Sequence, residues 1–252
     1  MARPDFPQED LNRLEIVTAS GRPEPFIDPT AVSTDGQTTV YFRNLAARLI
    51  EYIGDSDIVI GCVAWLTDRE ILHALARTKG TALIVQKEDF LRPDIDTRDR
   101  DAFKRRLRNE YNALPEGPSR YAYQSTIVPE LSFASDPTLA PVRCVGGHNV
   151  DRRSAFPRAH HKFVLFCRLE DPKTGGGDGY SWVDSGAVYP YAVWTGSFNF
   201  SKNATKSLDN AVVLRDPQIV NAYYQEWAQI LAVSEPLDWT ATWIAPDWRI
   251  GS

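Results

Sequence analysis

Short apolar runs that alternate with helix-like segments constrain the fold of this chain more than any other feature. DIVIGCVAWL, residues 57–66, and TALIVQK, residues 81–87, are nearly continuous apolar runs with many β-branched side chains. Such runs are typical of strands covered on both faces. Between them, residues 67–80 begin with two capping candidates, Thr67 and Asp68, and end in a glycine, as helices commonly do. Strands that alternate with helices in this way predict a layered α/β fold.

The same rhythm continues along the rest of the chain. Apolar side chains recur at helical spacing in residues 41–57, and the strongly charged residues 96–114 predict a further helix with a solvated face. Strands are also expected at residues 142–147, 160–167, 191–198 and 210–215, helices at 201–208 and 217–232, and a loop at 170–186.

The periodic segments predict one domain with an extension at each end. Residues 1–37 are rich in Pro, Asp, Thr and Gly, which predicts an extended lead-in. Residues 38–232 carry the periodic pattern without a recognisable linker and form the expected domain. Residues 233–252 form a Trp-rich tail, which either covers the core or contacts a partner.

Composition limits the kinds of partner that the protein can bind and the cell compartment in which it is expected. The net charge of -5 argues against a surface coated in positive charge, so any contact with nucleic acid must use a local basic patch. The three cysteines, Cys62, Cys144 and Cys167, lie in apolar runs without the spacing of a zinc site or a disulfide framework. The N-terminus lacks the apolar core of a secretory signal, and no uncharged apolar run approaches the roughly 18 residues of a membrane span. We therefore expect a cytoplasmic protein.

Two pairs of polar residues at strand ends suit phosphoryl chemistry. His160 and Lys162 are two residues apart, as are Ser197 and Asn199, so in extended chain each pair shares one face. The turn that follows Gly196 is rich in small polar groups and leads into an expected helix, an arrangement that favours anion binding. If the two strands are adjacent, all four side chains can meet one phosphate.

These residues carry a resemblance to a known family. RAHHKFVLF (158–166) and TGSFNFSKNATKSLDNAVV (195–213) resemble the H-x-K and G-S-x-N motifs of the phospholipase D superfamily, in its single-copy bacterial endonuclease form. The resemblance covers roughly residues 38–231 and implies a mixed β-sheet flanked by helices on both faces, an α/β/α sandwich. It implies that His160 and Lys162 are the family histidine and lysine, and that Ser197 and Asn199 contact phosphate.

The fit to the family motif is incomplete in two places. Asp209 lies where the nuclease branch usually has a glutamate that orients the histidine. The pattern H-x-K-x4-D places its aspartate at Cys167, and the segment 168–195 that follows is longer than is usual in the family. Three acids in this insertion could replace the missing aspartate, and the sequence selects none of them: Asp171, Asp178 and Asp184.

The resemblance also implies a mechanism that needs no metal and no cofactor. A neutral imidazole attacks phosphorus to give a phosphohistidine, and a second histidine protonates the leaving oxygen. The chain has no second H-x-K, since His73 lies in a helical pattern and His148 is followed by Asn149 and Val150. A homodimer that joins two copies of His160 at its two-fold axis supplies the second imidazole.

Several neighbouring residues have two readings. Arg152, Arg153 and Arg158 precede His160 and form either a basic rim that attracts a phosphodiester backbone or an ordinary polar loop. His161 should point to the opposite face from His160.

Three functions are compatible with the sequence. The favoured one is a metal-independent nuclease that cleaves DNA or RNA; a role in antiviral defence would rest on association alone. The second is a phospholipid hydrolase, which would need a membrane-binding surface, and the sequence contains no amphipathic anchor. The third is a catalytically weakened binding subunit of a larger assembly with a further protein partner, suggested by Cys167 and Asp209.

Overall fold

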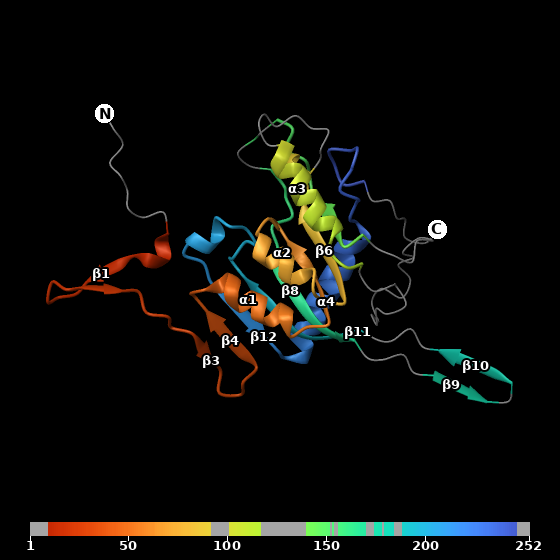
Figure 1. The fold of residues 1–252 in the computed structure, drawn as a ribbon, viewed down its shortest axis with the longest axis horizontal. Coiled ribbons are helices and arrows are strands. Elements are labelled where there is room, and N and C mark those ends of the chain that lie inside the picture. Colours follow the sequence, from red (N-terminus) through yellow and green to blue (C-terminus); the bar gives the residue numbers. More distant parts are fainter. Residues whose placement is uncertain are drawn as a thin grey trace.

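One eight-stranded sheet forms the centre of the molecule (Figure 1). The computed structural model describes residues 10–91, 101–116, 140–151, 153, 156–169, 174–177, 179–183 and 188–245. The strand order is β3-β4-β12-β11-β8-β5-β6-β7, with β5, β6 and β7 parallel and the remaining pairs antiparallel. The strands are β3 (Ala31–Val32), β4 (Thr38–Tyr41), β5 (Ile58–Val63), β6 (Gly80–Gln86), β7 (Val142–Val145), β8 (Lys162–Leu169), β11 (Val188–Gly196) and β12 (Ala211–Leu214).

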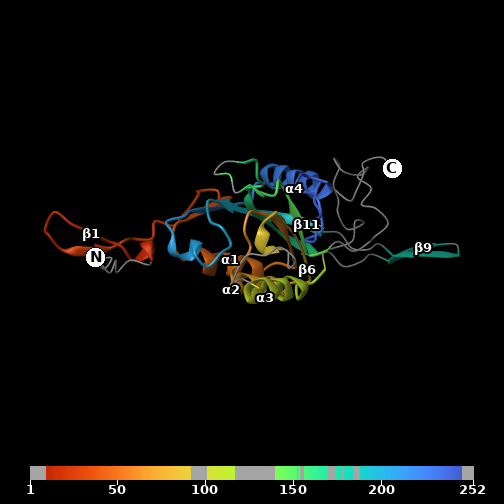
Figure 2. The same cartoon turned by 90° about the horizontal axis from the view of Figure 1, so that it is seen from above.

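Helices cover both faces of this sheet. They are α1 (Leu45–Gly54), α2 (Arg69–Leu75), α3 (Asp101–Asn112) and α4 (Pro217–Ala232). Figure 2 shows α1, α2 and α3 on one face and α4 on the other. Two buried clusters match these layers: Leu49, Ile71 and Leu107 lie in the first, and Trp227 and Leu231 in the second. The expected mixed sheet between two helical layers is confirmed.

Local sequence explains the central elements. All of β5 is buried, as its apolar run predicts, and Gly61 is needed there because a Cβ would collide with the backbone of Phe163 and Val164 on β8. Of the two capping candidates for α2, Asp68 caps the helix: its carboxylate accepts hydrogen bonds from the backbone N–H groups of Glu70 (3.0 Å) and Ile71 (3.1 Å).

Two expected elements differ in the structure. Residues 201–208 contain only a 3-10 turn, Ala204–Lys206, instead of a helix. Their polar side chains bond to the local backbone, as when the Thr205 hydroxyl donates to the Lys202 carbonyl (2.7 Å), and such bonds compete with helix formation. The expected loop at 170–186 contains an antiparallel hairpin, β9 (Thr174–Gly177) and β10 (Tyr180–Val183), which projects from the body (Figure 1).

The N-terminal segment forms short strands. β1 (Glu15–Val17) and β2 (Pro23–Pro25) make a separate two-stranded sheet, whereas β3 joins the central sheet by pairing with β4. The Asn12 side chain donates to the backbone carbonyls of Thr205 and Ser207, both at 3.1 Å, and so connects this segment to the turn after Asn199.

The C-terminal tail is fixed to the sheet by a buried ion pair. The ammonium of Lys87, directly after β6, lies 2.5 Å from the carboxylate of Glu235, and the two side chains are 0% and 3% exposed. Lys87 also donates to the carbonyl of Trp243 (2.7 Å), and the backbones of Cys144 and Glu235 exchange two hydrogen bonds. Trp239 is buried in the core, Trp243 is exposed, and Trp248 lies outside the described residues.

No helix in the described ranges is long and apolar enough to cross a bilayer.

Candidate active site at one edge of the sheet

The sheet register brings the two motif segments together. Lys162, the first residue of β8, pairs with Val63 at the end of β5, and Thr195 near the end of β11 pairs with Phe163. Because β8 and β11 are antiparallel neighbours, the start of one lies beside the end of the other. His160 and Lys162 therefore lie at the same sheet edge as the turn that carries Ser197 and Asn199.

His160 is exposed beside a tryptophan. Its ring centroid is 6.1 Å from that of Trp65, with the two planes at 85°. The pKa of His160 is lowered from its usual value, first by partial burial and then by the positive charges of Lys162 and Arg158. A lowered pKa keeps the imidazole neutral, which is the form that can act as a nucleophile.

Lys162 lies beneath His160 and is only 9% exposed. Its ammonium donates to the backbone carbonyl of His160 at 2.9 Å. Burial lowers the pKa of Lys162, and the negative charge of Asp209 opposes this shift. The lysine thus fixes the backbone that carries the imidazole and supplies a positive charge next to it.

Ser197 and Asp209 form a second contact at this edge. The Ser197 hydroxyl donates to the Asp209 carboxylate at 2.6 Å and accepts from the backbone N–H of Asn210 at 3.1 Å. Gly196 permits this approach, because a Cβ there would collide with the carbonyl of Asn210. Asp209 therefore contacts Ser197, and its negative charge favours the protonated form of Lys162. The role of orienting His160, which the resemblance implies for Asp209, stays a prediction.

Asn199 has an unusual polar atom. Its side-chain Oδ1 is buried and has no hydrogen-bond partner among the described residues. Buried polar atoms are nearly always paired, so the amide end of Asn199 is open to a further hydrogen-bond partner. The flanking Phe198 and Phe200 are each 1% exposed and pack in the core, as their alternation with the polar residues indicates.

His161 points away from this site, as the alternation predicts. Its Nε2 lies 3.6 Å from a carboxylate oxygen of Glu226 on α4, and its ring packs 5.6 Å from that of Phe163.

The expected basic rim is only partly connected to the site. Arg158 stacks over Phe156 at 4.3 Å, and its charge lowers the pKa of His160. Arg153 instead pairs with Asp151 at 2.9 Å, with both side chains exposed. Arg152 lies outside the described residues, as do the three acids of the insertion, Asp171, Asp178 and Asp184.

Cys167 cannot take the role of the family aspartate. It is 0% exposed and packs with the α4 cluster, on the opposite face of β8 from Lys162. Burial raises the pKa of its thiol well above the usual range. The residue is part of the core and does not face the site.

Trp65 and Glu88 were not identified from the sequence. The Trp65 indole N–H donates to Glu88 at 3.1 Å, and burial raises the pKa of that carboxyl. Trp65 follows β5 and Glu88 follows β6, and both strands end at this edge of the sheet. This position after a strand is the one sequence signal that could have indicated them as site residues. Nearby, the imidazole of His148 and the carboxylate of Asp89 form a close hydrogen bond. Within the described ranges, no three His, Cys, Asp or Glu side chains gather as ligands for a metal ion.

The structural resemblance extends to solved proteins. The chain is similar to NucT from Helicobacter pylori, with 12% identity, 79% of this chain and 98% of that chain covered, and a TM-score of 0.48. It is also similar to Nuc from Salmonella typhimurium, a phospholipase D family member, with 15% identity, 79% and 95% coverage, and a TM-score of 0.43. Phosphatidylserine synthase from Haemophilus influenzae gives 13% identity, 83% and 41% coverage, and a TM-score of 0.34.

Sequence comparison gives a nearer relative. No family model matches the chain. It is 30% identical over 217 residues to an uncharacterized protein of Acanthamoeba polyphaga mimivirus, covering 82% of this chain and 69% of that protein. The chain therefore belongs to the same family as this mimivirus protein.

Proposed function

We propose that this protein is a metal-independent phosphodiesterase of the phospholipase D type that cleaves DNA or RNA. The observation that carries the proposal is the meeting of two motif segments at one sheet edge. There Lys162 is bonded to the backbone of His160, and Ser197 is bonded to Asp209. These contacts support a site in which the His160 imidazole acts beside one buried cation, Lys162, and two uncharged hydrogen-bonding groups, Ser197 and Asn199.

The reaction follows from these groups. The His160 imidazole attacks phosphorus, the bond to the leaving oxygen breaks, and a phosphohistidine forms. Lys162 and the side-chain amide of Asn199 bind the non-bridging oxygens, on which negative charge is concentrated, and Ser197 joins them by turning its one hydroxyl hydrogen from Asp209 to the phosphate. Water then attacks the phosphohistidine and releases the second product. The orphaned side chain of Asn199 gains a partner when phosphate is bound, in the amide orientation that donates a hydrogen.

The leaving oxygen needs a proton, which a second imidazole supplies. His161 faces α4 and His148 is paired with Asp89, so neither is placed as the partner of His160 within one chain. A second copy of the chain, with its own His160 across a two-fold axis, provides the acid. The active form is therefore a homodimer with one shared site.

The test compares two adjacent histidines. Labelled single-stranded DNA, duplex DNA and RNA are incubated in excess EDTA with wild type, His160→Ala or His161→Ala. We expect His160→Ala to lose cleavage by on the order of a thousand-fold or more, because the nucleophile is removed. His161→Ala should retain most activity, since its ring lies on the other face of the strand.

The same assay separates the competing functions. Equal cleavage by wild type and His160→Ala would overturn the assignment of the nucleophile. No cleavage of any polymer by wild type would overturn the nuclease proposal, and phospholipid vesicles would then be the substrate to assay.

A further inference from the structure

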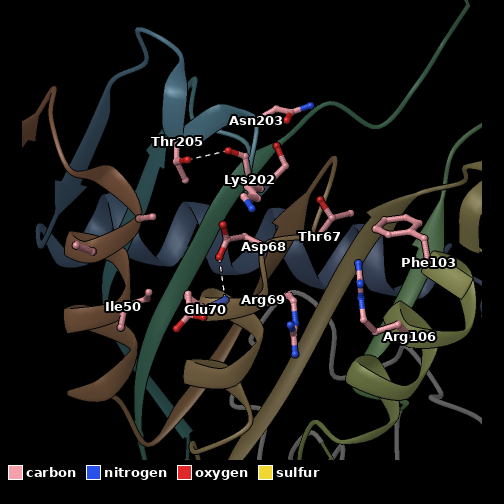
Figure 3. A pocket seen from close by; sticks show the side chains of 13 residues that line it. Ile50, Thr67, Asp68, Arg69, Glu70, Phe103, Arg106, Lys202, Asn203 and Thr205 are labelled. Carbon is pink, nitrogen blue, oxygen red and sulfur yellow. Dashed lines mark hydrogen bonds between the residues drawn. The ribbon is translucent and has the colours of Figure 1, made fainter. Parts of the chain in front are cut away.

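A cavity of about 860 Å³ opens beside residues 197–205, which we call the motif turn. Figure 3 shows it between three parts of the chain: the start of α2, one side of α3, and residues 201–205, with α1 also contributing. Neither the motif resemblance nor the proposed mechanism uses this space.

The walls of the cavity follow directly in the chain after residues at the proposed active site. The carbonyl of Phe200 accepts hydrogen bonds from the backbone N–H groups of Thr67 (2.8 Å) and Asp68 (3.0 Å), which joins two of its walls. Ser201 lies two residues after Asn199, and Thr67 lies two residues after Trp65, the ring that contacts His160. Two residues span at most about 7 Å of chain, so the cavity walls begin within that distance of Asn199 and Trp65, close enough for a polymer bound at His160 to extend toward them.

The cavity is lined by charges of both signs, and some of them are already paired. Five ionisable side chains line it: Arg69, Arg106 and Lys202 against Asp68 and Glu70. The Asp68 carboxylate is engaged by the backbone of α2, and Arg69 is paired with Glu110 at 2.8 Å.

Two cations remain available on facing walls. Arg106 on α3 and Lys202 on the motif turn are exposed and make no salt bridge with any described residue. Arg106 is held over the ring of Phe103 at 5.6 Å, which orients its guanidinium without neutralising it. In Figure 3 the two side chains come from opposite sides of the cavity.

We propose that this cavity is a second phosphate-binding subsite, in which Arg106 and Lys202 bind the phosphate next to the scissile phosphodiester of a single nucleic-acid strand. The inference rests on the proposed function and adds a substrate property to it. A simple phospholipid carries one phosphodiester and leaves the second site empty, whereas a polynucleotide fills both. Two adjacent phosphate sites therefore select for a polymer.

Binding tests the subsite without depending on catalysis. A fluorescently labelled single-stranded oligonucleotide is titrated with His160→Ala protein, and with the same protein carrying Lys202→Gln, Arg106→Gln or both. The double change should weaken binding roughly ten-fold and reduce the slope of log affinity against log salt by about 0.7, the contribution of one phosphate contact on a single strand.

Two control variants exclude a general effect of charge or folding. Arg105→Gln removes an exposed cation of α3 that does not line the cavity, and it should leave affinity and slope unchanged. Lys202→Arg keeps the charge and should retain binding. The subsite is overturned if the double variant binds with the affinity and salt slope of its parent, or if the parent does not bind the oligonucleotide.

The proposed function is tested by a separate substrate. Bis(p-nitrophenyl) phosphate has a single phosphate and reports only on the reacting site, compared between wild type and His160→Ala. Equal hydrolysis by the two proteins sinks the proposed function, whereas the oligonucleotide titration alone decides the subsite.

Discussion

At the scale of single residues, the reacting edge is organised by one buried cation. Lys162 is almost fully buried, yet its ammonium donates a hydrogen bond to the His160 carbonyl and is stabilised by the negative charge of Asp209. The same ammonium lowers the pKa of His160. One side chain thus holds the backbone of the imidazole and, after partial burial, contributes to the lowered pKa of His160.

A neighbouring arginine allows this electrostatic effect to be tested without removing Lys162. Arg158→Gln should raise the pKa of His160 toward the usual 6.5, because one of the positive charges that disfavour the imidazolium is lost. The acid limb of the kcat/KM profile then moves to higher pH. NMR titration of the His160 ring proton measures the pKa directly. Arg153→Gln, which breaks only the exposed pair with Asp151, is the control; equal shifts in both variants would contradict the assignment.

Introducing the aspartate that the motif resemblance places at position 167 should not help this chain. Cys167→Asp places a carboxyl in the fully buried cluster under α4, so we expect a loss of at least about 2 kcal/mol in the free energy of unfolding and no gain in activity. Cys167→Ser serves as the milder comparison. Urea unfolding gives the free energies, and a Cys167→Asp protein as stable as wild type would show that this position has a polar partner.

At the scale of elements, the tail is bonded to the edge strand β7 of the sheet. Lys87 follows β6, Glu235 belongs to the tail, and their ion pair is closed off from solvent. Arg143 on β7 adds a bond to the Ser234 hydroxyl at 2.7 Å. The pair therefore joins the end of a central strand to the segment that covers the edge strand.

Breaking this pair should be costly. Lys87→Met leaves the Glu235 carboxylate buried without its partner, and we expect a loss of about 3–5 kcal/mol in the free energy of unfolding. The double variant Lys87→Met/Glu235→Gln should recover part of the loss. Lys79→Met removes an exposed partner of Asp57, and should cost less than about 1 kcal/mol. Equal losses from Lys87→Met and Lys79→Met, measured in urea, would show that the buried pair has no special weight.

Sequence patterns predict the elements whose formation is driven by burial. β5, β6 and β8 are nearly continuous apolar runs, and all three form as predicted. The shared face expected for His160 and Lys162, and for Ser197 and Asn199, stays a prediction. The helix predicted at 201–208 is wrong, because hydrogen bonds from side chains to the local backbone compete with helix formation there. Lys87 and Glu235, or Trp65 and Glu88, could not be paired in advance, because each contact joins residues distant in sequence and leaves no periodic signal.

At the scale of the whole molecule, a shared active site predicts how mixed dimers behave. When wild type and His160→Ala chains are co-expressed and fully mixed, activity should fall as the square of the wild-type fraction, because each site needs both imidazoles. Light scattering should give the mass of a dimer. A linear fall in activity, or a monomer with full activity, would contradict the shared site.

The two outer strands of the described sheet, β3 and β7, expose few unpaired backbone N–H and C=O groups. At one border β3 has two residues, and at the other the tail occupies the hydrogen-bonding groups of Cys144 on β7. An open strand edge is a template for the addition of further chains, which can continue without limit into fibres. Here one border strand has only two residues, and the other is bonded to the tail at Cys144, so the addition of a further strand is disfavoured at both. The tail thereby protects the sheet from unwanted growth as well as stabilising the fold.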